Sequence, residues 1–482
     1  MLKYHCFFTK KLTMTIIINQ KISSAPSIGK GFGQHKSLMF VVLCISFLLL
    51  DTDPAIATTV NSKFKTEHNI LSMQHRSLVI DDILEKRVKQ LLPGLMRQAN
   101  VDMWILISRE YNEDPILKTF LPATWMGARR RTILVFTDTE KEGISAQAIA
   151  RYDVGTIFKE AWDKEKQPDQ MQALLELIKA RNPNRIAINQ SADYELADGL
   201  VATERDLLFS YLPSQYRERI VSAEPLAVSW LETRIKEEVE LLNEMVALTK
   251  VIIKQGFSNE VIRPRKTTVG DLVWWFRDRV SQLGLQTWFH PSIRLQRKYK
   301  KLGVSEDPNL IILPGDFLHV DFGISYLRLN TDIQQHAYVL KAEETTAPKF
   351  LQDALKQGNQ LQDILVENFV VGRSGNEILS RTREQALLAG IKPMIYSHPI
   401  GYYGHASGTT IGKWDSQFGV AGEGDRALHQ DTAYAIELNV EVASLEWQKD
   451  IMIMLEENAI FRRDKVSYLA PRQTELILIN YK

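Results

Sequence analysis

The most informative segments of this chain are Phe317-Leu-His-Val-Asp-Phe-Gly323 and Asn330-Thr-Asp-Ile333. Each carries an acidic residue among residues that favour extended backbone. We predict two strands over 317–324 and 331–340, joined by a short turn around Tyr326-Leu327. Together the strands would form an antiparallel hairpin.

The acidic residues of this hairpin, Asp321 and Asp332, predict a metal site. If they lie opposite each other, their side chains are about 5 Å apart on one face. Two facing carboxylates repel, and one takes up a proton unless a cation lies between them. An aspartate on its own is more often a turn cap than a ligand, so the prediction depends on the pair.

Three residues further along the chain complete a ligand set: His398, Glu437 and Glu456. Glu437 lies between Ile436 and Leu438, so on a strand it points away from both apolar neighbours, as expected of a ligand on a concave sheet face. Four carboxylates and one imidazole suit two ions of Mn, Co, Fe or Zn. The absence of a thiolate argues against a structural zinc cage.

This pattern resembles the creatinase/methionine aminopeptidase superfamily (peptidase family M24), and Xaa-Pro aminopeptidases in particular. The first two aspartates of that family lie eleven residues apart, as they do here. Its histidine opens a His-x-[Ile/Leu]-Gly-x-x-x-His pattern, which the segment from His398 to His405 matches, and its last glutamate stands in an acidic pair like Glu456-Glu457. The resemblance covers roughly residues 75–475. The family's ligand order is matched by Asp321, Asp332, His398, Glu437 and Glu456.

The resemblance implies an α/β (α+β) fold class with two domains. A creatinase-like α/β domain would occupy 75–225, and a pita-bread metallopeptidase domain would follow at 232–480. It also implies two divalent metal ions, with Mn as the first choice and Co, Fe or Zn as alternatives. By the family pattern, Asp332 and Glu456 would bridge both ions. Asp321 would hold one ion, and His398 and Glu437 the other.

The implied activity is that of a metallo-aminopeptidase that removes the N-terminal residue of peptides, by hydrolysis of Xaa-Pro bonds in particular. The leader described below predicts that this enzyme is exported. Two metal ions about 3.5–4 Å apart would activate a water for the attack. Glu437 is the candidate for handling the proton of that water, and His405 for stabilising the tetrahedral intermediate. The implied partner is a peptide substrate, and a homodimer is left open.

The substrate side of the site departs from the family pattern. The family carries a histidine before the first aspartate, where this chain has Val304-Ser305-Glu306; His290 either covers that role from a shifted position or lies in an apolar pocket. The family's Glu-Pro-Gly is Glu437-Leu438-Asn439 here, and the arginine before its last glutamate is Met454.

Two other functions compete with the peptidase. One is a pita-bread protein that binds a peptide or partner without turnover, and the other is a creatinase-like, metal-independent hydrolase of C–N bonds. Relatives with either use lack the full ligand set, which this chain keeps.

Composition is that of an ordinary soluble globular chain, with 45% hydrophobic residues, 24% charged residues and a net charge of +1. This balance gives no case for nucleic-acid binding. One basic cluster is predicted to be a solvated loop; the alternative is that it lies near the site and receives a peptide carboxylate. Its members are Arg294, Arg297, Lys298, Lys300 and Lys301.

Residues 1–57 are predicted to be a leader that contains a signal peptide. The twelve apolar or small residues of 39–50 are too few to span a bilayer but suit the core of a signal peptide. Lys36 precedes them, and Ala55-Ile56-Ala57 follows as a cleavage site. Cleavage after Ala57 would give an exported chain, periplasmic or secreted, without a stable membrane span.

Two further expectations follow from this leader. Its length favours a true start at Met14 or nearer Met39. Both cysteines, Cys6 and Cys44, precede the cleavage site, so the mature chain would contain neither a disulfide nor a thiol nucleophile.

Alternating helices and strands before residue 225 predict an α/β domain, and a domain boundary is predicted at 222–232, which contains Pro225. The elements predicted before this boundary are helices at 80–100 and 171–181 and strands at 103–108, 132–136 and 185–189. Helices predicted after it are at 232–255, 269–283, 349–368 and 375–389.

Overall fold

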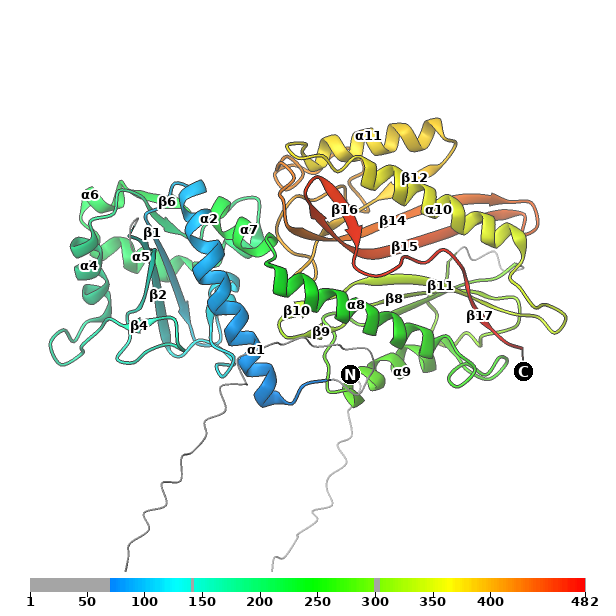
Figure 1. Ribbon diagram of the computed structural model, residues 1–482, viewed down its shortest axis with the longest axis horizontal. Coiled ribbons are helices and arrows are strands. Elements are labelled where there is room, and N and C mark those ends of the chain that lie inside the picture. The colour runs from blue at the N-terminus through cyan, green and yellow to red at the C-terminus, as the bar shows by residue number, and fades with distance from the viewer. Residues whose placement is uncertain (1–69, 140–142, 299–303, 482) are drawn as a thin grey trace, which may run out of the picture. The chain divides into compact units, whose positions relative to one another are not determined.

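The described residues form two large β-sheets, with helices packed against them, and one small two-stranded sheet (Figure 1). The computed structural model describes residues 70–139, 143–298 and 304–481. The predicted leader, with its apolar run, its cleavage site and both cysteines, lies outside these residues, as do Lys300 and Lys301. Within the described ranges, no helix is long and apolar enough to cross a membrane.

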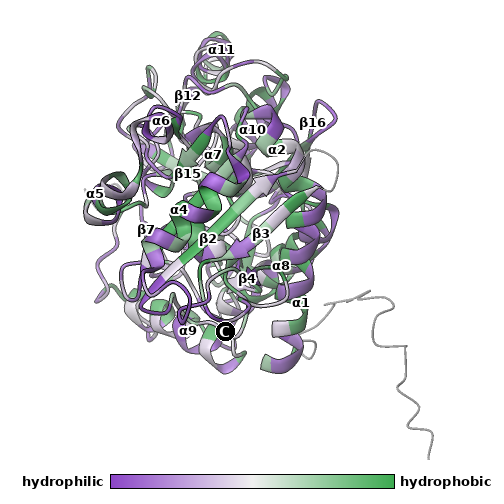
Figure 2. Cartoon of the chain, turned by 90° about the vertical axis from the view of Figure 1, so that its left-hand side faces the viewer, coloured by the Kyte–Doolittle hydropathy of each residue, from purple (hydrophilic) through white to green (hydrophobic). Residues whose placement is uncertain are grey.

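The smaller sheet belongs to the N-terminal part and has the strand order β4-β3-β2-β1-β5-β6. Its central strands are buried over most of their length. They are also largely apolar, as the hydropathy colours of Figure 2 show for β2. All three strands predicted here are present. The strands are β1 (Met103–Arg109), β2 (Arg131–Asp138), β3 (Ile144–Ala148), β4 (Lys159–Glu160), β5 (Ile186–Ile188) and β6 (Ile220–Ser222).

Separate apolar clusters form the core on the two faces of this sheet, as expected for an α/β layer arrangement. Trp104 and Phe120 belong to one cluster, whereas Ile105 and Leu174 belong to the other. The predicted helix at 171–181 is confirmed. The helices of this part are α3 (Pro115–Phe120), α4 (Gln170–Arg181), η4 (Glu195–Ala197), α5 (Ala202–Tyr211) and α6 (Ser214–Arg217).

The first helical segment is longer and less regular than the predicted 80–100. It consists of α1 (Met73–Lys86), a π-helical turn η3 (Arg87–Leu91) and α2 (Leu92–Gln98). Ser72 caps the beginning, because its side chain accepts a hydrogen bond from the backbone amide of His75. The sequence predicted a helix in this segment but not the residue at which it begins.

The predicted boundary at 222–232 is mostly helical. Helix α7 (Glu224–Glu232) has Pro225 in its first turn, where the missing amide hydrogen costs no hydrogen bond. The charged helix predicted at 232–255 begins after a short break, as α8 (Lys236–Gly256).

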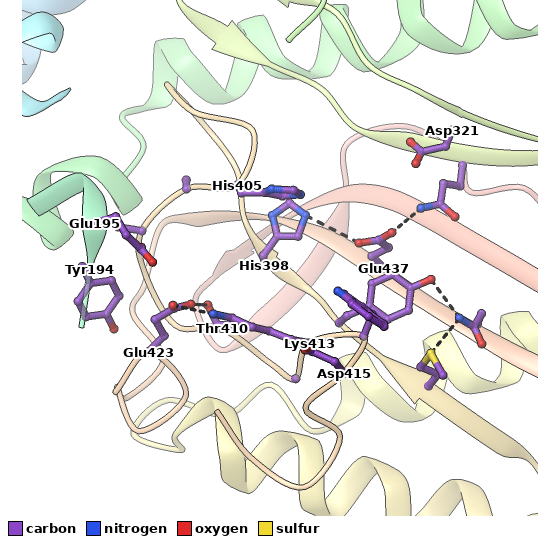
Figure 3. Close-up of a pocket in the computed structure, with 18 of the residues that line it drawn as sticks. Tyr194, Glu195, Asp321, His398, His405, Thr410, Lys413, Asp415, Glu423 and Glu437 are labelled. Carbon is purple, nitrogen blue, oxygen red and sulfur yellow. Dashed lines mark hydrogen bonds and ion pairs between the residues drawn. The ribbon is translucent and has the colours of Figure 1, made fainter. Parts of the chain in front are cut away.

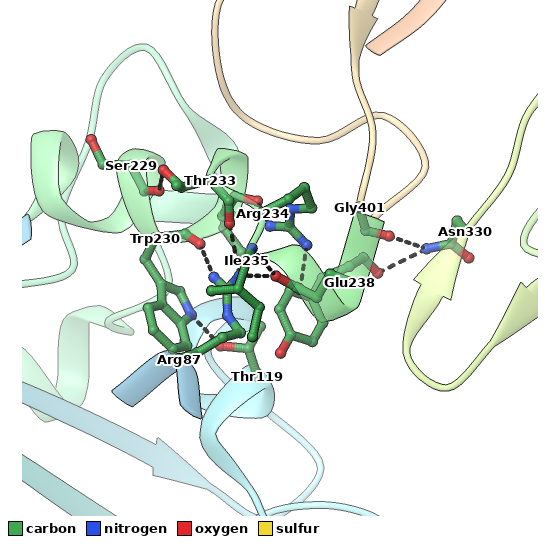
Figure 4. A network of polar contacts seen from close by, with 12 residues as sticks. Arg87, Thr119, Ser229, Trp230, Thr233, Arg234, Ile235, Glu238, Asn330 and Gly401 are labelled. Atoms are coloured by element: carbon green, nitrogen blue, oxygen red, sulfur yellow. Dashed lines mark hydrogen bonds and ion pairs between the residues drawn. The ribbon is translucent and has the colours of Figure 1, made fainter. Parts of the chain in front are cut away.

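A buried ionic network connects the first helical segment to the beginning of α8 (Figure 4). Glu238 accepts hydrogen bonds from Arg87 at 2.5 Å and from Arg234 at 2.9 Å. Arg87 also donates to the backbone carbonyls of Trp230 and Thr233. Removal of the carboxylate would leave two buried cations without their shared partner, a change that typically costs about 3–5 kcal/mol.

The larger sheet has the main strand order β12-β14-β15-β11-β8-β7, and three short strands pair with interior strands outside this path. β13 pairs with β14, β16 with β15, and β17 with β11. The strands are β7 (Ser292–Gln296), β8 (Phe317–Phe322), β11 (Ile333–Val339), β12 (Lys392–Ile395), β13 (His398–Pro399), β14 (Thr432–Ser444), β15 (Lys449–Arg462), β16 (Lys465–Tyr468) and β17 (Ile477–Ile479).

Two pairs of helices pack against this sheet (Figure 1). Strands β7, β8, β11, β12 and β14 also contribute residues to the cleft described below. Helices α8 and α9 share one apolar cluster with β7, β8 and β11, whereas α10 and α11 share another with β12, β14 and β15. The helices predicted at 269–283, 349–368 and 375–389 are confirmed within one residue at each end. They are α9 (Val269–Gln282), α10 (Lys349–Glu367) and α11 (Gly375–Leu388).

The hairpin that carries the two aspartates has a different register from the predicted one. β8 and β11 pair Asp321 with Gln334, not with Asp332. The connection contains a second, smaller hairpin of β9 (Ser325–Tyr326) and β10 (Leu329–Asn330), and it turns at Leu327-Arg328, where both residues have positive φ. The register error is two residues, and side chains alternate with a period of two, so Asp332 still lies on the same face as Asp321.

Candidate metal centre

Four neighbouring strands bring polar residues into one row across the large sheet. Asp321 on β8 pairs with Gln334 on β11, which pairs with Glu456 on β15, which pairs with Glu437 on β14. Residues directly opposite in such ladders have side chains on the same face. Three of the five predicted ligands therefore stand in one row, with Gln334 between them.

The other two ligands stand in the adjacent row on the same face. Asp332 lies two positions before Gln334, and His398 pairs with Ala435, two positions before Glu437. The backbone amide of Asp332 is held by the side chain of Asn458 at 3.0 Å. Five residues spread over 136 positions of sequence thus meet because the sheet register aligns them.

All five predicted ligands come together in the structure, and Figure 3 shows three of them with His405. Candidate ligand atoms of Asp321, Asp332 and Glu456 lie within 4.8 Å of one another, and so do those of His398, Glu437 and Glu456. The two groups share Glu456, as expected of a residue that contacts two ions. A third group brings Asp332 and His398 together with His405, which was not predicted as a ligand.

His398 has the orientation of a metal ligand. Its Nδ1 lies 2.9 Å from the carbonyl oxygen of Pro399, a contact that requires the proton on Nδ1 and leaves a lone pair on Nε2. That Nε2 lies 3.9 Å from Glu437 Oε2 and 3.8 Å from Glu456 Oε1. These separations leave room for an ion to bind all three atoms.

Burial and mutual repulsion make this group of acids unstable in its charged form. Burial raises the pKa of Asp321 to about 6, and raises the pKa values of Asp332, Glu437 and Glu456 well above their ordinary range. Burial also lowers the pKa of His398 to about 3, so its ring is neutral. Divalent cations would remove the repulsion and favour the carboxylates.

These residues fit two divalent cations. Within the described chain, four buried atoms of the site lack a hydrogen-bond partner: Asp321 Oδ1, Asp332 Oδ1, His398 Nε2 and Glu456 Oε1. Unpaired buried acceptors are costly and rare in folded proteins, whereas metal coordination satisfies them. Oxygen donors with one imidazole suit Mn and related ions.

The site opens into a cleft of about 840 Å³, a size typical of ligand-binding pockets. His405 lines this cleft beside the metal ligands, and the ring centroids of His398 and His405 are 4.7 Å apart at nearly a right angle (Figure 3). Tyr194 and Glu195, from the N-terminal part, also line it. The cleft therefore offers space beside the candidate metal ligands for a short peptide.

The prediction that the basic cluster forms a solvated loop is wrong for Arg294. It lies on β7 and lines the cleft, so it is not in a solvated loop. Its Nε donates to Glu306 at 2.6 Å, and its charge lowers the pKa of Asp321 against the effect of burial. Arg297 is also paired, with Asp316. For Arg294 the structure supports the alternative prediction, which places its charge near the site.

His290 does not fill the place of the missing histidine. It is exposed, it contacts Arg277 and Trp274, and it is absent from the lining of the cleft. It therefore lies neither on the substrate side of the site nor in an apolar pocket.

The other two departures from the family pattern lie in the site. Asn439 lines the cleft and donates a hydrogen bond to the hydroxyl of Tyr396 at 3.1 Å. Met454 contacts the guanidinium of Arg294 through its sulfur at 3.3 Å. The family pattern has an arginine at the position of Met454 on β15. In this chain, Arg294 extends from β7 to that position.

Several residues of the site were missed by the sequence analysis: Gln334, Tyr396, Lys413 and Glu195. The only signal for Gln334 is its alternation with Asp332 and His336, three polar residues on one face of the strand. Lys413 and Glu195 come from loop and short helical segments, which have no periodicity that could mark them.

Comparison with solved structures identifies the fold. The chain is similar to X-Pro aminopeptidase from Thermotoga maritima, with a TM-score of 0.55, 14% identity and coverage of 80% of this chain and 99% of that one. It is similar to Xaa-Pro dipeptidase from Bacillus anthracis, with a TM-score of 0.53, 15% identity and coverage of 83% and 99%. It is also similar to a histidine-to-alanine variant of Escherichia coli aminopeptidase P. The TM-score is 0.55 and the identity 12%, with coverage of 84% of this chain and 97% of that one.

No protein-family model matches this sequence, and no curated protein sequence matches it. The structural likeness shows that the chain has the two-part, pita-bread fold of these aminopeptidases and this dipeptidase. At 12–15% sequence identity, the likeness extends to the fold alone. The predicted fold class, with a creatinase-like part before a pita-bread part, is confirmed.

Proposed function

We propose that this protein is an exported metallo-aminopeptidase of the Xaa-Pro type, which hydrolyses the bond after the first residue of a peptide. The observation that carries the proposal is the convergence of all five predicted ligands at a peptide-sized cleft. A binding protein without turnover would not need this buried group of acids, which is costly to maintain.

The proposed cofactor is a pair of divalent ions, with Mn as the first choice and Co, Fe or Zn as alternatives. When bound, they would supply Lewis acidity and lower the pKa of water at the site. Asp332 and Glu456 would serve both positions, Asp321 would serve one, and His398 and Glu437 would serve the other.

The remaining roles follow from position in the cleft. Glu437 is less buried than Glu456 and lines the cleft, so its carboxylate is the one that can accept a proton from water beside a substrate. His405 is exposed to the cleft and can donate a hydrogen bond to the oxygen of the scissile carbonyl as charge develops there. Arg294 offers a cation for a substrate carboxylate.

Metal content tests the proposal directly. We expect the purified mature protein to hold up to two divalent ions per chain, and Asp332→Ala to empty the site because it removes a carboxylate common to both positions. Elemental analysis by mass spectrometry measures this. Glu441→Ala, which removes an exposed carboxylate of β14, is the control and should keep the metal. A wild type with no more metal than Asp332→Ala would contradict the proposal.

Proline preference is tested with matched peptides. We expect Ala-Pro peptides to be cleaved faster than Ala-Ala peptides under saturating Mn, and His405→Ala to lower kcat by about 10²-fold or more while metal content stays unchanged. Release of the first residue can be followed by chromatography. Equal rates on both peptides would remove the proline preference and leave a metallo-aminopeptidase. No release from either peptide would leave a metal-binding module.

A further inference from the structure

We propose that Gln334, held in turn by His319, is a positioning residue that fixes the carboxylates of Glu437 and Glu456 for metal binding. The proposal rests on the proposed function, because it concerns the same metal centre. Gln334 stands in the ligand row between Asp321 and Glu456, and its side chain is almost completely buried.

The amide nitrogen of Gln334 contacts both glutamates. Its Nε2 donates to Glu437 Oε1 and, at 3.0 Å, to Glu456 Oε2. The two N–H groups of one amide therefore bind one oxygen of each carboxylate. A carboxylate ligand has no hydrogen to offer, so the nitrogen of this amide must face the glutamates and its oxygen must point away.

The remaining oxygens are the ones that face His398. Glu437 Oε2 and Glu456 Oε1 are the atoms 3.9 Å and 3.8 Å from His398 Nε2, and neither is the atom bound by Gln334. One amide thus sets the rotation of two carboxyl groups so that each presents a free oxygen to the same space. Without it, each carboxyl group could rotate about its last bond.

His319 fixes the orientation of Gln334. Its Nε2 lies 2.9 Å from Gln334 Oε1 and must donate, because that oxygen can only accept. His319 is the register partner of His336, and both rings are fully buried. His336 is itself held, because its Nε2 accepts from the backbone amide of Met454 at 3.0 Å. His319 therefore donates to Gln334, and Gln334 in turn donates to the two glutamates among the candidate metal ligands.

Side chains of this kind behind a metal site typically change metal affinity by 10- to 100-fold when they are removed. We expect Gln334→Met, which keeps the length of the side chain but has no donor, to weaken Mn binding by about 10-fold or more. His319→Leu should weaken it in the same direction. His319→Gln should restore most of the affinity, because a glutamine amide can donate to Gln334 as the imidazole does.

Isothermal titration of Mn into the chelator-treated full mature chain gives the affinity and the number of ions without any activity assay. Gln335→Met is the matched control: it is the same substitution on the next residue of β11, whose side chain points to the opposite face. Circular dichroism of the metal-free variants checks that each remains folded.

Mn affinity of folded Gln334→Met within twofold of the wild type would overturn the proposal, and so would equal losses in His319→Gln and His319→Leu. A Gln334→Met chain that does not fold leaves the two His319 variants to decide. A wild type that binds no Mn would instead contradict the proposed function. The two failures are therefore distinguishable.

Discussion

Gly323, which has no side chain, allows a close backbone approach in the β8–β11 hairpin that carries Asp321 and Asp332. A Cβ atom at this position would lie 2.1 Å from the backbone carbonyl oxygen of Thr331 and 2.9 Å from Trp288 Nε1. The first of these neighbours is backbone and cannot rotate away. Thr331 directly precedes Asp332, so any movement that relieves the contact would shift a proposed bridging ligand.

We therefore expect Gly323→Ala to lower the free energy of unfolding by about 1–3 kcal/mol, as overpacking commonly does, and to weaken Mn binding. Urea unfolding and metal titration measure the two effects. Gly94→Ala is the control, because no atom lies within 4 Å of a Cβ there and the residue is in helix α2. It should be neutral or stabilise the protein by up to about 1 kcal/mol. Equal effects of the two substitutions would contradict this account.

Helix α3 begins with a buried aspartate whose protonation affects stability. Asp114 Oδ1 accepts hydrogen bonds from the backbone amides of Ile116 and Leu117, and its Oδ2 accepts from Asn189 at 2.8 Å. Burial outweighs these bonds and raises the pKa of Asp114 from 3.8 to about 6. The folded chain thus holds this proton more tightly than the unfolded chain does.

The sign of the pH effect follows from this shift. A raised pKa in the folded state stabilises the fold below about pH 4, and the contribution is lost as the pH rises through about 6. Two pKa units correspond to about 3 kcal/mol. Because asparagine does not titrate, the Asp114→Asn variant should not lose this contribution as the pH rises. We therefore expect the difference in unfolding free energy between wild type and variant to change by up to about 3 kcal/mol between pH 4 and 7. Urea unfolding across this range measures it, and a constant difference would contradict the assignment.

At the scale of the whole molecule, the leader predicts export. The apolar run at 39–50 and the Ala55-Ile56-Ala57 site predict cleavage after Ala57 and a mature chain that begins at Thr58. N-terminal sequencing of protein from cells that express the full chain measures this. An intact leader on soluble cytoplasmic protein would contradict export, and an intact leader in the membrane fraction would indicate an anchored form.

Sequence alone predicted an α/β arrangement, the longer helices, several central strands and the five candidate ligands, because these depend on local patterns of residue type. The pita-bread fold was implied by the family resemblance. Apolar periodicity marks the buried face of α4 or β2, and an acidic residue inside an apolar strand, such as Asp321 or Glu456, is too costly to bury without a purpose.

Tertiary structure decided which residues stand beside these ligands. The register that pairs Asp321 with Gln334 depends on the additional β9–β10 hairpin. The turn of that hairpin has positive φ at Leu327 and Arg328, and the sequence does not mark it because neither residue is a glycine. Arg294 reaches the site because β7 pairs with β8, and His290 stays outside it although it precedes the same strand. Such neighbours are set by pairing between strands distant in sequence, and no local pattern along the chain records that pairing.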